Sequence, residues 1–189
     1  MKATIVLVAG NDAENFGRRV MLEAHRIGKM GFEMARLPQH VSLKQPFVIP
    51  GLDEMEAFFD EFAREQKPVR IELEELGIHP SNVLGGVPSG CMSIGVKASV
   101  ELKEMQRVLF HRLEERFGPC PAEHDDDYMF HMTVAIGGAP FANYQAAYEV
   151  LKERNFHQEF VFDRLGLLYY DDDNICPGTY FCYKMVKLA

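Results

Sequence analysis

The stretch Tyr128–Ile136 reads YMFHMTVAI, and its side chains alternate in character along the chain. Successive side chains of a β-strand point to opposite faces, so residues two apart share a face. One face of the predicted strand is apolar and holds Tyr128, Phe130, Met132, Val134 and Ile136. The opposite face holds His131 and Thr133. We therefore predict a strand that buries one face and turns an imidazole and a hydroxyl away from the core.

A second copy of this His-x-Ser/Thr triplet lies in the segment Met34–Phe47, which we also predict to contain a strand. Alternation places His40, Ser42 and Lys44 on one face of that strand. The other face is mainly apolar and is interrupted by Gln39 and Gln45. Two segments that are far apart in the sequence thus present the same pair of chemical groups.

The order of predicted elements after each triplet is also repeated: motif strand, helix, strand, strand. Val69 begins a predicted strand 29 residues after His40. Glu159 begins one 28 residues after His131. These similar offsets indicate a duplicated pattern, and they predict two similar half-domains with a cleft between them.

The length of 189 residues suits one compact domain. We predict that residues 1–189 form this domain, with one triplet in each of two lobes, at about 35–98 and 128–189. Residues 1–34 and 99–127 are expected to complete the sheets and to supply outer helices.

The two triplets together supply what displacement at phosphorus requires. An unperturbed imidazole titrates near pH 6.5 and can therefore give or take a proton at neutral pH. The incoming oxygen needs a base and the leaving oxygen needs an acid, and the two lie roughly in line across the phosphorus. We predict that His40 and His131 are this acid–base pair. We further predict that Ser42, Thr133 and Lys44 bind the phosphate oxygens, and that no metal ion or other cofactor is needed.

Composition limits the partners that this chain can have. Its formal net charge is −8, whereas proteins that hold long nucleic acids usually have a basic surface. We therefore expect a small nucleotide or an RNA end as substrate, and no extended nucleic acid. No apolar run approaches the roughly 20 residues of a membrane span, and the four cysteines lack a C-x-x-C spacing. A cytoplasmic protein with free thiols and no membrane partner is the expectation.

Other features of the sequence receive simpler interpretations. A third triplet, His79-Pro80-Ser81, falls in the turn-rich segment 77–90 and is predicted to form a turn in a loop. The acidic clusters Asp125–Asp127 and Asp171–Asp173 follow no EF-hand spacing, so we interpret them as solvated turns.

The tetrapeptides HVSL (His40–Leu43) and HMTV (His131–Val134) resemble the paired motifs of the 2H phosphoesterase superfamily. This superfamily includes bacterial and archaeal 2′-5′ RNA ligase / RNA 2′,3′-cyclic phosphodiesterase proteins, and the resemblance covers nearly the whole chain. It implies a bilobal α+β fold with pseudo-twofold duplication, in which two antiparallel sheets line a central cleft and helices pack outside. It also implies metal-independent hydrolysis of a cyclic phosphate, or transfer at a 2′-5′ phosphodiester.

Two other functions remain open at this point. The same scaffold could serve as a non-catalytic protein that binds phosphate or a nucleotide in the cleft. A metallohydrolase is the third hypothesis, and it predicts that EDTA abolishes activity and that added metal restores it.

Overall fold

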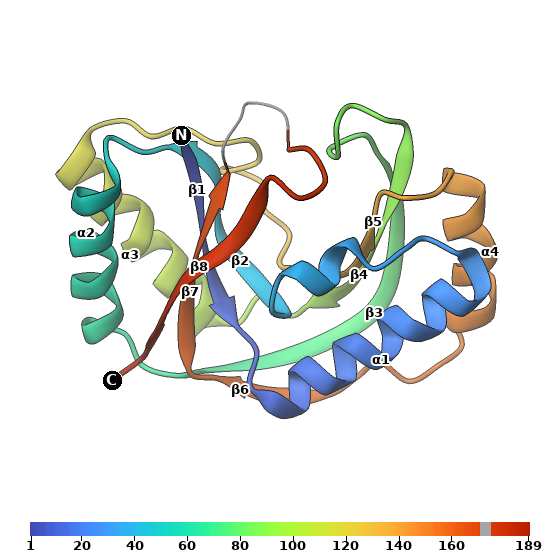
Figure 1. Ribbon diagram of the computed structural model, residues 1–189. Helices are drawn as coiled ribbons and strands as arrows, with labels where there is room; N and C mark the ends of the chain where they lie inside the picture. Colours follow the sequence, from blue (N-terminus) through green and yellow to red (C-terminus); the bar gives the residue numbers. More distant parts are fainter. Residues whose placement is uncertain (171–174) are drawn as a thin grey trace.

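The computed structural model describes residues 1–170 and 175–189 (Figure 1). Within these residues, strands and helices alternate along much of the chain. In chain order the elements are β1 (Lys2–Val8), α1 (Asn11–Gly28), the short 3₁₀ helix η1 (Glu33–Arg36), β2 (His40–Val48), α2 (Leu52–Glu65), β3 (Val69–Ser81), β4 (Ser89–Val96), α3 (Val100–Phe117), β5 (His131–Ile136), α4 (Phe141–Leu151), β6 (Glu159–Phe162), β7 (Arg164–Tyr170) and β8 (Tyr180–Lys187).

The strands form two four-stranded sheets, with the orders β2-β1-β7-β8 and β5-β4-β3-β6. All strand pairs are antiparallel, and the predicted α+β class with two antiparallel sheets is confirmed. Helices α2 and α3 lie outside the first sheet, and α1 and α4 lie beside the second (Figure 1). The motif strands β2 and β5 are the edge strands of their sheets, and they contact one another.

The duplication in the structure has a different phase from the predicted one. The elements β1-α1-β2-α2-β3 are followed by an equivalent series, β4-α3-β5-α4 and then β6 with β7. Helices α1 and α3 hold equivalent places in these two series, and both contain 18 residues. The repeat therefore begins one strand and one helix before each motif strand.

The lobes that we predicted at 35–98 and 128–189 do not coincide with the two sheets. Each sheet takes strands from both ranges, because the last strand of each half crosses to the other sheet. Strand β3 pairs with β4, and β7 pairs with β1. The long strand β3 has 13 residues, and its first part pairs with β6 as the two halves cross. The halves are therefore interlocked by backbone hydrogen bonds.

Two apolar clusters hold this arrangement together. The larger one packs the helices on the outer faces of the sheets, and it includes four fully or almost fully buried residues of α2: Met55, Phe58, Phe59 and Phe62. The smaller cluster joins the inner faces, because it unites Val6 and Val8 of β1 with Leu84 from the β3–β4 hairpin. It also contains Met34 and Leu37, which anchor the segment that leads into β2.

Candidate active site

Each motif strand begins at its histidine, and the two strands have equivalent pairings. His40 lies opposite Val8 of β1, whereas His131 lies opposite Gly95 of β4. The hydroxyl residues follow the same pattern two positions later. Ser42 lies opposite Val6 on β1, and Thr133 lies opposite Ser93 on β4. The histidine and hydroxyl of each motif therefore share one face of their sheet, as predicted.

A register shift occurs at the same place in both motifs. Val6 and Ile5 are consecutive residues of β1, but they lie opposite Ser42 and Lys44 of β2, so that Leu43 is an extra residue in β2. Ser93 and Met92 are likewise consecutive in β4, but they lie opposite Thr133 and Ala135 of β5, so that Val134 is the extra residue in β5. An extra residue of this kind is a β-bulge, which breaks the alternation of faces in the bulged strand. The bulge directly follows the hydroxyl in each half.

The two imidazoles are oriented in the same way by the backbone. His40 Nδ1 lies 2.8 Å from the carbonyl oxygen of Pro38, and His131 Nδ1 lies 2.8 Å from that of Met129. A carbonyl oxygen can only accept a hydrogen bond, so each Nδ1 must carry a proton and donate it. In the neutral ring, Nε2 then carries the lone pair. Both histidines are thus held in the tautomer that presents Nε2 as a base.

The charge of His131 acts on His40. Burial lowers the pKa of His40 below its ordinary value of 6.5, the hydrogen bond to Pro38 opposes this shift, and the positive charge of His131 lowers the pKa further. Burial likewise lowers the pKa of His131. Both side chains are half-buried, so part of each imidazole remains accessible to solvent. The charge of His131 thus reaches His40 where β2 contacts β5.

Tyr128 connects the two motifs. Its ring centroid lies 5.9 Å from that of His131. Its hydroxyl is buried near Ser42 and Gln45 of β2, without a well-formed hydrogen bond, and burial raises its pKa to about 12. A neutral phenol therefore packs between the second imidazole and the first hydroxyl. The sequence pattern favoured core packing for Tyr128, with stacking on a base as the alternative.

The Thr133 hydroxyl lies beside the thiol of Cys91 on the neighbouring strand β4. Burial raises the pKa of this thiol to about 12, and the interaction with Thr133 opposes the shift. The thiol is therefore protonated at neutral pH and is no candidate nucleophile. It instead forms part of the wall that holds the Thr133 side chain.

Lys44 does not lie with the histidines, which corrects the face that alternation predicted for it. Because Leu43 forms the bulge, Lys44 pairs with Ile5, whose side chain is in the larger core. Lys44 is only 2% exposed, forms an ion pair with Asp125, and lies 4.4 Å from the ring centroid of Phe110 in α3. Its charge is thus used to hold the loop before β5 against α3, and it is not a phosphate ligand in this arrangement.

Glu14 of α1 is a site residue that the sequence analysis missed. Its carboxylate accepts a 2.6 Å hydrogen bond from the backbone N–H of Gln39, directly before the first motif. The negative charge of Glu14 also raises the pKa of His40, against the larger effect of burial. The contact spans 25 residues of sequence, so no local pattern could have revealed it.

The third triplet is not in a loop, because β3 continues to Ser81. His79 pairs with Cys91 of β4, and its positive charge lowers the pKa of His131. Of the acidic clusters, Asp125–Asp127 contributes the partner of Lys44, while Asp171–Asp173 lies outside the described residues. No group of three or more His, Cys, Asp or Glu side chains in the described ranges is placed to hold a metal ion.

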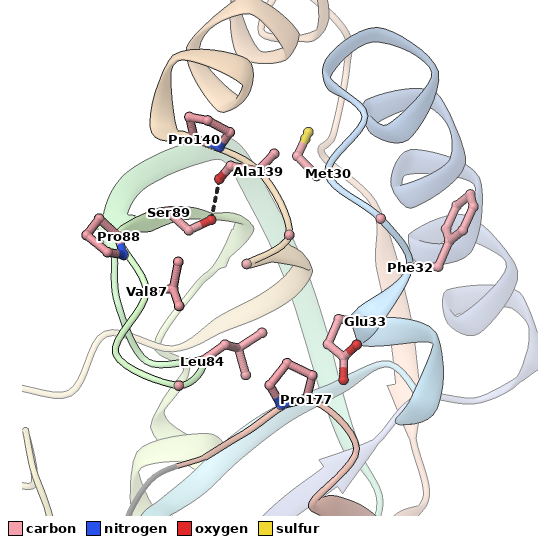
Figure 2. A pocket seen from close by; sticks show the side chains of 14 residues that line it. Met30, Phe32, Glu33, Leu84, Val87, Pro88, Ser89, Ala139, Pro140 and Pro177 are labelled. Atoms are coloured by element: carbon pink, nitrogen blue, oxygen red, sulfur yellow. Dashed lines mark hydrogen bonds between the residues drawn. The ribbon is translucent and has the colours of Figure 1, made fainter.

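A cavity of about 510 Å³ opens where β5 ends (Figure 2). Its wall combines the segment after α1, the tip of the β3–β4 hairpin, the turn after β5 and Pro177, which precedes β8. Most of the lining side chains are apolar, and Figure 2 shows Leu84, Val87, Pro88 and Pro177 around the opening. Glu33 adds a carboxylate that accepts a 3.0 Å hydrogen bond from the Tyr180 hydroxyl.

Among the helices of the described residues, none is long and apolar enough to cross a lipid bilayer.

Comparisons to known proteins agree with the observed fold. A family model described as the 2′-5′ RNA ligase superfamily matches residues 22–174. The crystal structure of TT0787 of Thermus thermophilus is 16% identical, with a TM-score of 0.67 and coverage of 100% of this chain and 98% of that one. E. coli LigT in complex with NADP⁺ is 13% identical, with a TM-score of 0.55 and coverage of 99% and 97%.

Kluyveromyces marxianus Usb1 is 11% identical, with a TM-score of 0.53 and coverage of 99% and 97%. The sequence has no significant match among curated proteins. At these identities the solved structures establish a shared fold, and the family model establishes the sequence relationship.

Replacing Asp125 with Asn should destabilise the protein, because it leaves the buried ammonium of Lys44 without its charged partner. Removing one partner of a buried ion pair costs about 3–5 kcal/mol, which urea unfolding can measure. The exposed ion-pair residue Glu104 is the control, and Glu104→Gln should change stability by less than about 1 kcal/mol. Equal effects of the two substitutions would contradict the assigned role of Lys44.

Replacing His131 with Gln should raise the pKa of His40, because the positive charge of His131 lowers it in the native protein. An NMR titration of the His40 Cε1–H resonance measures this pKa directly. His111→Gln, on the exposed face of α3, should leave it unchanged. An unchanged or lower pKa of His40 in His131→Gln would show that the two imidazoles are not coupled.

Proposed function

This chain belongs to the 2′-5′ RNA ligase superfamily, and we propose that it is a metal-independent phosphoesterase that acts on a 2′,3′-cyclic phosphate or a 2′-5′ phosphodiester of RNA or a nucleotide. The observation that carries the proposal is the matched orientation of His40 and His131. Each ring donates from Nδ1 to the carbonyl oxygen two residues earlier, so that both Nε2 atoms are available for proton transfer.

The proposed hydrolysis needs one proton to be taken and one to be given. The neutral Nε2 of one histidine accepts a proton from water as its oxygen bonds to phosphorus. The protonated Nε2 of the other gives its proton to the leaving ribose oxygen as the P–O bond breaks. The product is a phosphomonoester with a free ribose hydroxyl, and the two histidines have exchanged protonation states. With an RNA hydroxyl in place of water, the same roles join two strands through a phosphodiester. In the reverse of that step the ribose hydroxyl attacks, the other RNA oxygen leaves, and the roles of the two histidines exchange.

The remaining motif residues fit the needs of the transition state. The hydroxyls of Ser42 and Thr133 share the faces of the two histidines and are half-buried, so they can donate hydrogen bonds to non-bridging phosphate oxygens. Lys44 is left out of this set because of its buried ion pair with Asp125. The hydrogen bonds from Nδ1 stabilise the protonated rings as well, since Nδ1 donates in both protonation states.

Charge and cysteine chemistry support the proposed setting. Because the protein has a net charge of −8, a small nucleotide or an RNA end is a more favourable partner than an extended polyanion. All four cysteines are free thiols, as expected in the reducing cytoplasm. We therefore propose a cytoplasmic enzyme whose substrate is engaged at one phosphate.

The purified protein should hydrolyse a nucleoside 2′,3′-cyclic phosphate in the presence of EDTA. His40→Ala and His131→Ala should each lower kcat by about 10²–10⁴-fold, which is the usual contribution of a general acid or base. His111→Ala on α3 is the control and should retain full activity. Binding without turnover by the native protein would support a non-catalytic binder, and loss of turnover in EDTA would support a metallohydrolase.

The pH profile should reflect the lowered pKa values of both histidines. In the active form, one histidine is protonated at Nε2 and the other is not, because one ring acts as acid and the other as base. Burial lowers both pKa values below 6.5, and the charge of another histidine adds to each shift, so this form is populated on the acidic side of pH 6.5. We expect kcat/KM to be bell-shaped, with its maximum below pH 6.5 and a decline toward pH 8. A maximum above pH 7.5 would contradict the assignment.

A further inference from the structure

The inner face of the second sheet carries a third histidine, His79, beyond the two motifs. His79 lies opposite Cys91 on β4, and residues directly opposite each other in an antiparallel pair share a face. The Cys91 thiol in turn lies beside the Thr133 hydroxyl. His79, Cys91 and Thr133 are therefore on the same face of the sheet as His131.

Small residues occupy the face between His79 and the second motif. Gly77 lies opposite Ser93, and Ser93 lies opposite Thr133, so the three form one row across the sheet. A Cβ atom added to Gly77 would meet nothing nearer than the Ser93 carbonyl oxygen, at 4.0 Å. The face above this row is therefore open, and the half-buried Ser93 adds a hydroxyl to it.

The separation indicates which part of a substrate His79 could reach. His79 is two strands and two residues away from Thr133. With about 4.8 Å between strands and about 3.4 Å per residue, the two Cα atoms lie roughly 12 Å apart. A phosphate held by hydrogen bonds of about 2.7–3.2 Å to the motif residues is therefore too far from His79 to contact it as well. His79 is placed for the next group along the substrate.

The charge of His79 is available for an anion. Its side chain is exposed, and it has no hydrogen bond or ion pair within residues 1–170 and 175–189. The basic residues of β3, β4 and β5 are Arg70, His79 and His131. Arg70 pairs with Glu159 near the other end of β3, and Lys44 is held on the core side. The charge of His79 also acts on His131, which agrees with their common face.

We propose that His79 binds the phosphodiester that adjoins the reacting phosphate, so that the preferred substrate is an oligonucleotide end rather than a mononucleotide. The inference rests on the proposed phosphoesterase function. The open row of Gly77 and Ser93 would accommodate the sugar between the two phosphates, and an imidazolium N–H would donate a charge-assisted hydrogen bond to the second one.

The same face continues from His79 toward the cavity in Figure 2. Ser81, two residues after His79, lies opposite Ser89, and Ser89 lines the cavity. The Ser89 hydroxyl donates a hydrogen bond to the carbonyl oxygen of Ala139, and Ala139 also lines the cavity. The apolar walls of this cavity offer space for the base of the second nucleotide, because bases bind against apolar surfaces through their ring faces.

The test compares two substrates, a nucleoside 2′,3′-cyclic phosphate and a dinucleotide that ends in the same cyclic phosphate. The native protein should favour the dinucleotide by about tenfold in kcat/KM, mainly through KM, since one charge-assisted hydrogen bond is worth about a factor of ten. His79→Gln should remove this preference while the mononucleotide is still turned over; each variant is assayed at its own optimum pH, because the charge of His79 also lowers the pKa of His131. His79→Lys should retain the preference, because it restores a positive charge.

His111→Gln is the matched control: this histidine is exposed and pairs with Glu115 on α3, outside the second sheet, so the preference should persist. A dinucleotide preference that survives in His79→Gln, or its absence in the native protein, would overturn the inference while mononucleotide turnover still supports the proposed function. If neither substrate is turned over, calorimetry with a dinucleotide 3′-phosphate decides. Weaker binding to His79→Gln then supports the role of His79, and equal binding refutes it.

Discussion

The hydrogen bond from a histidine Nδ1 to the carbonyl oxygen two residues earlier is the interaction on which this site depends. It occurs at His40 and at His131 with the same length, 2.8 Å. A rotatable imidazole could present either nitrogen to a substrate, whereas this bond leaves Nε2 as the reactive atom in both rings. Because each carbonyl belongs to the residues that enter the motif strand, the start of that strand and the tautomer of its histidine are determined together.

The surroundings of each motif strand keep this geometry in place. The bulge residue Leu43 has lost its regular ladder position, and its carbonyl oxygen accepts a 2.9 Å hydrogen bond from Gln106 of α3. The ion pair between Lys44 and Asp125 connects the same part of β2 to the loop before β5. Glu14 holds the backbone on the other side of the motif. Residues that take no direct part in the proposed chemistry thus define where the first histidine lies.

The crossing of β3 and β7 between the sheets explains how two half-domains can form one site. Each sheet contains a motif strand from one half and a crossing strand from the other. The two motif strands are therefore edges that meet, and relative movement of the halves would break backbone hydrogen bonds of the crossing strands. The lowered pKa of His40, to which the charge of His131 contributes, depends on this fixed approach.

The sequence by itself determined the chemistry of the motifs. The two-residue period of a strand is a local property, so it correctly paired His40 with Ser42 and His131 with Thr133, and the resemblance of the two tetrapeptides indicated the family and the fold. Only the tertiary structure decided the positions of Lys44 and His79. A bulge after Ser42 turned Lys44 toward the core, and pairing with β4 extended β3 through His79. Bulges, register and strand length are set by hydrogen bonds to a partner strand, and that partner is distant in the sequence.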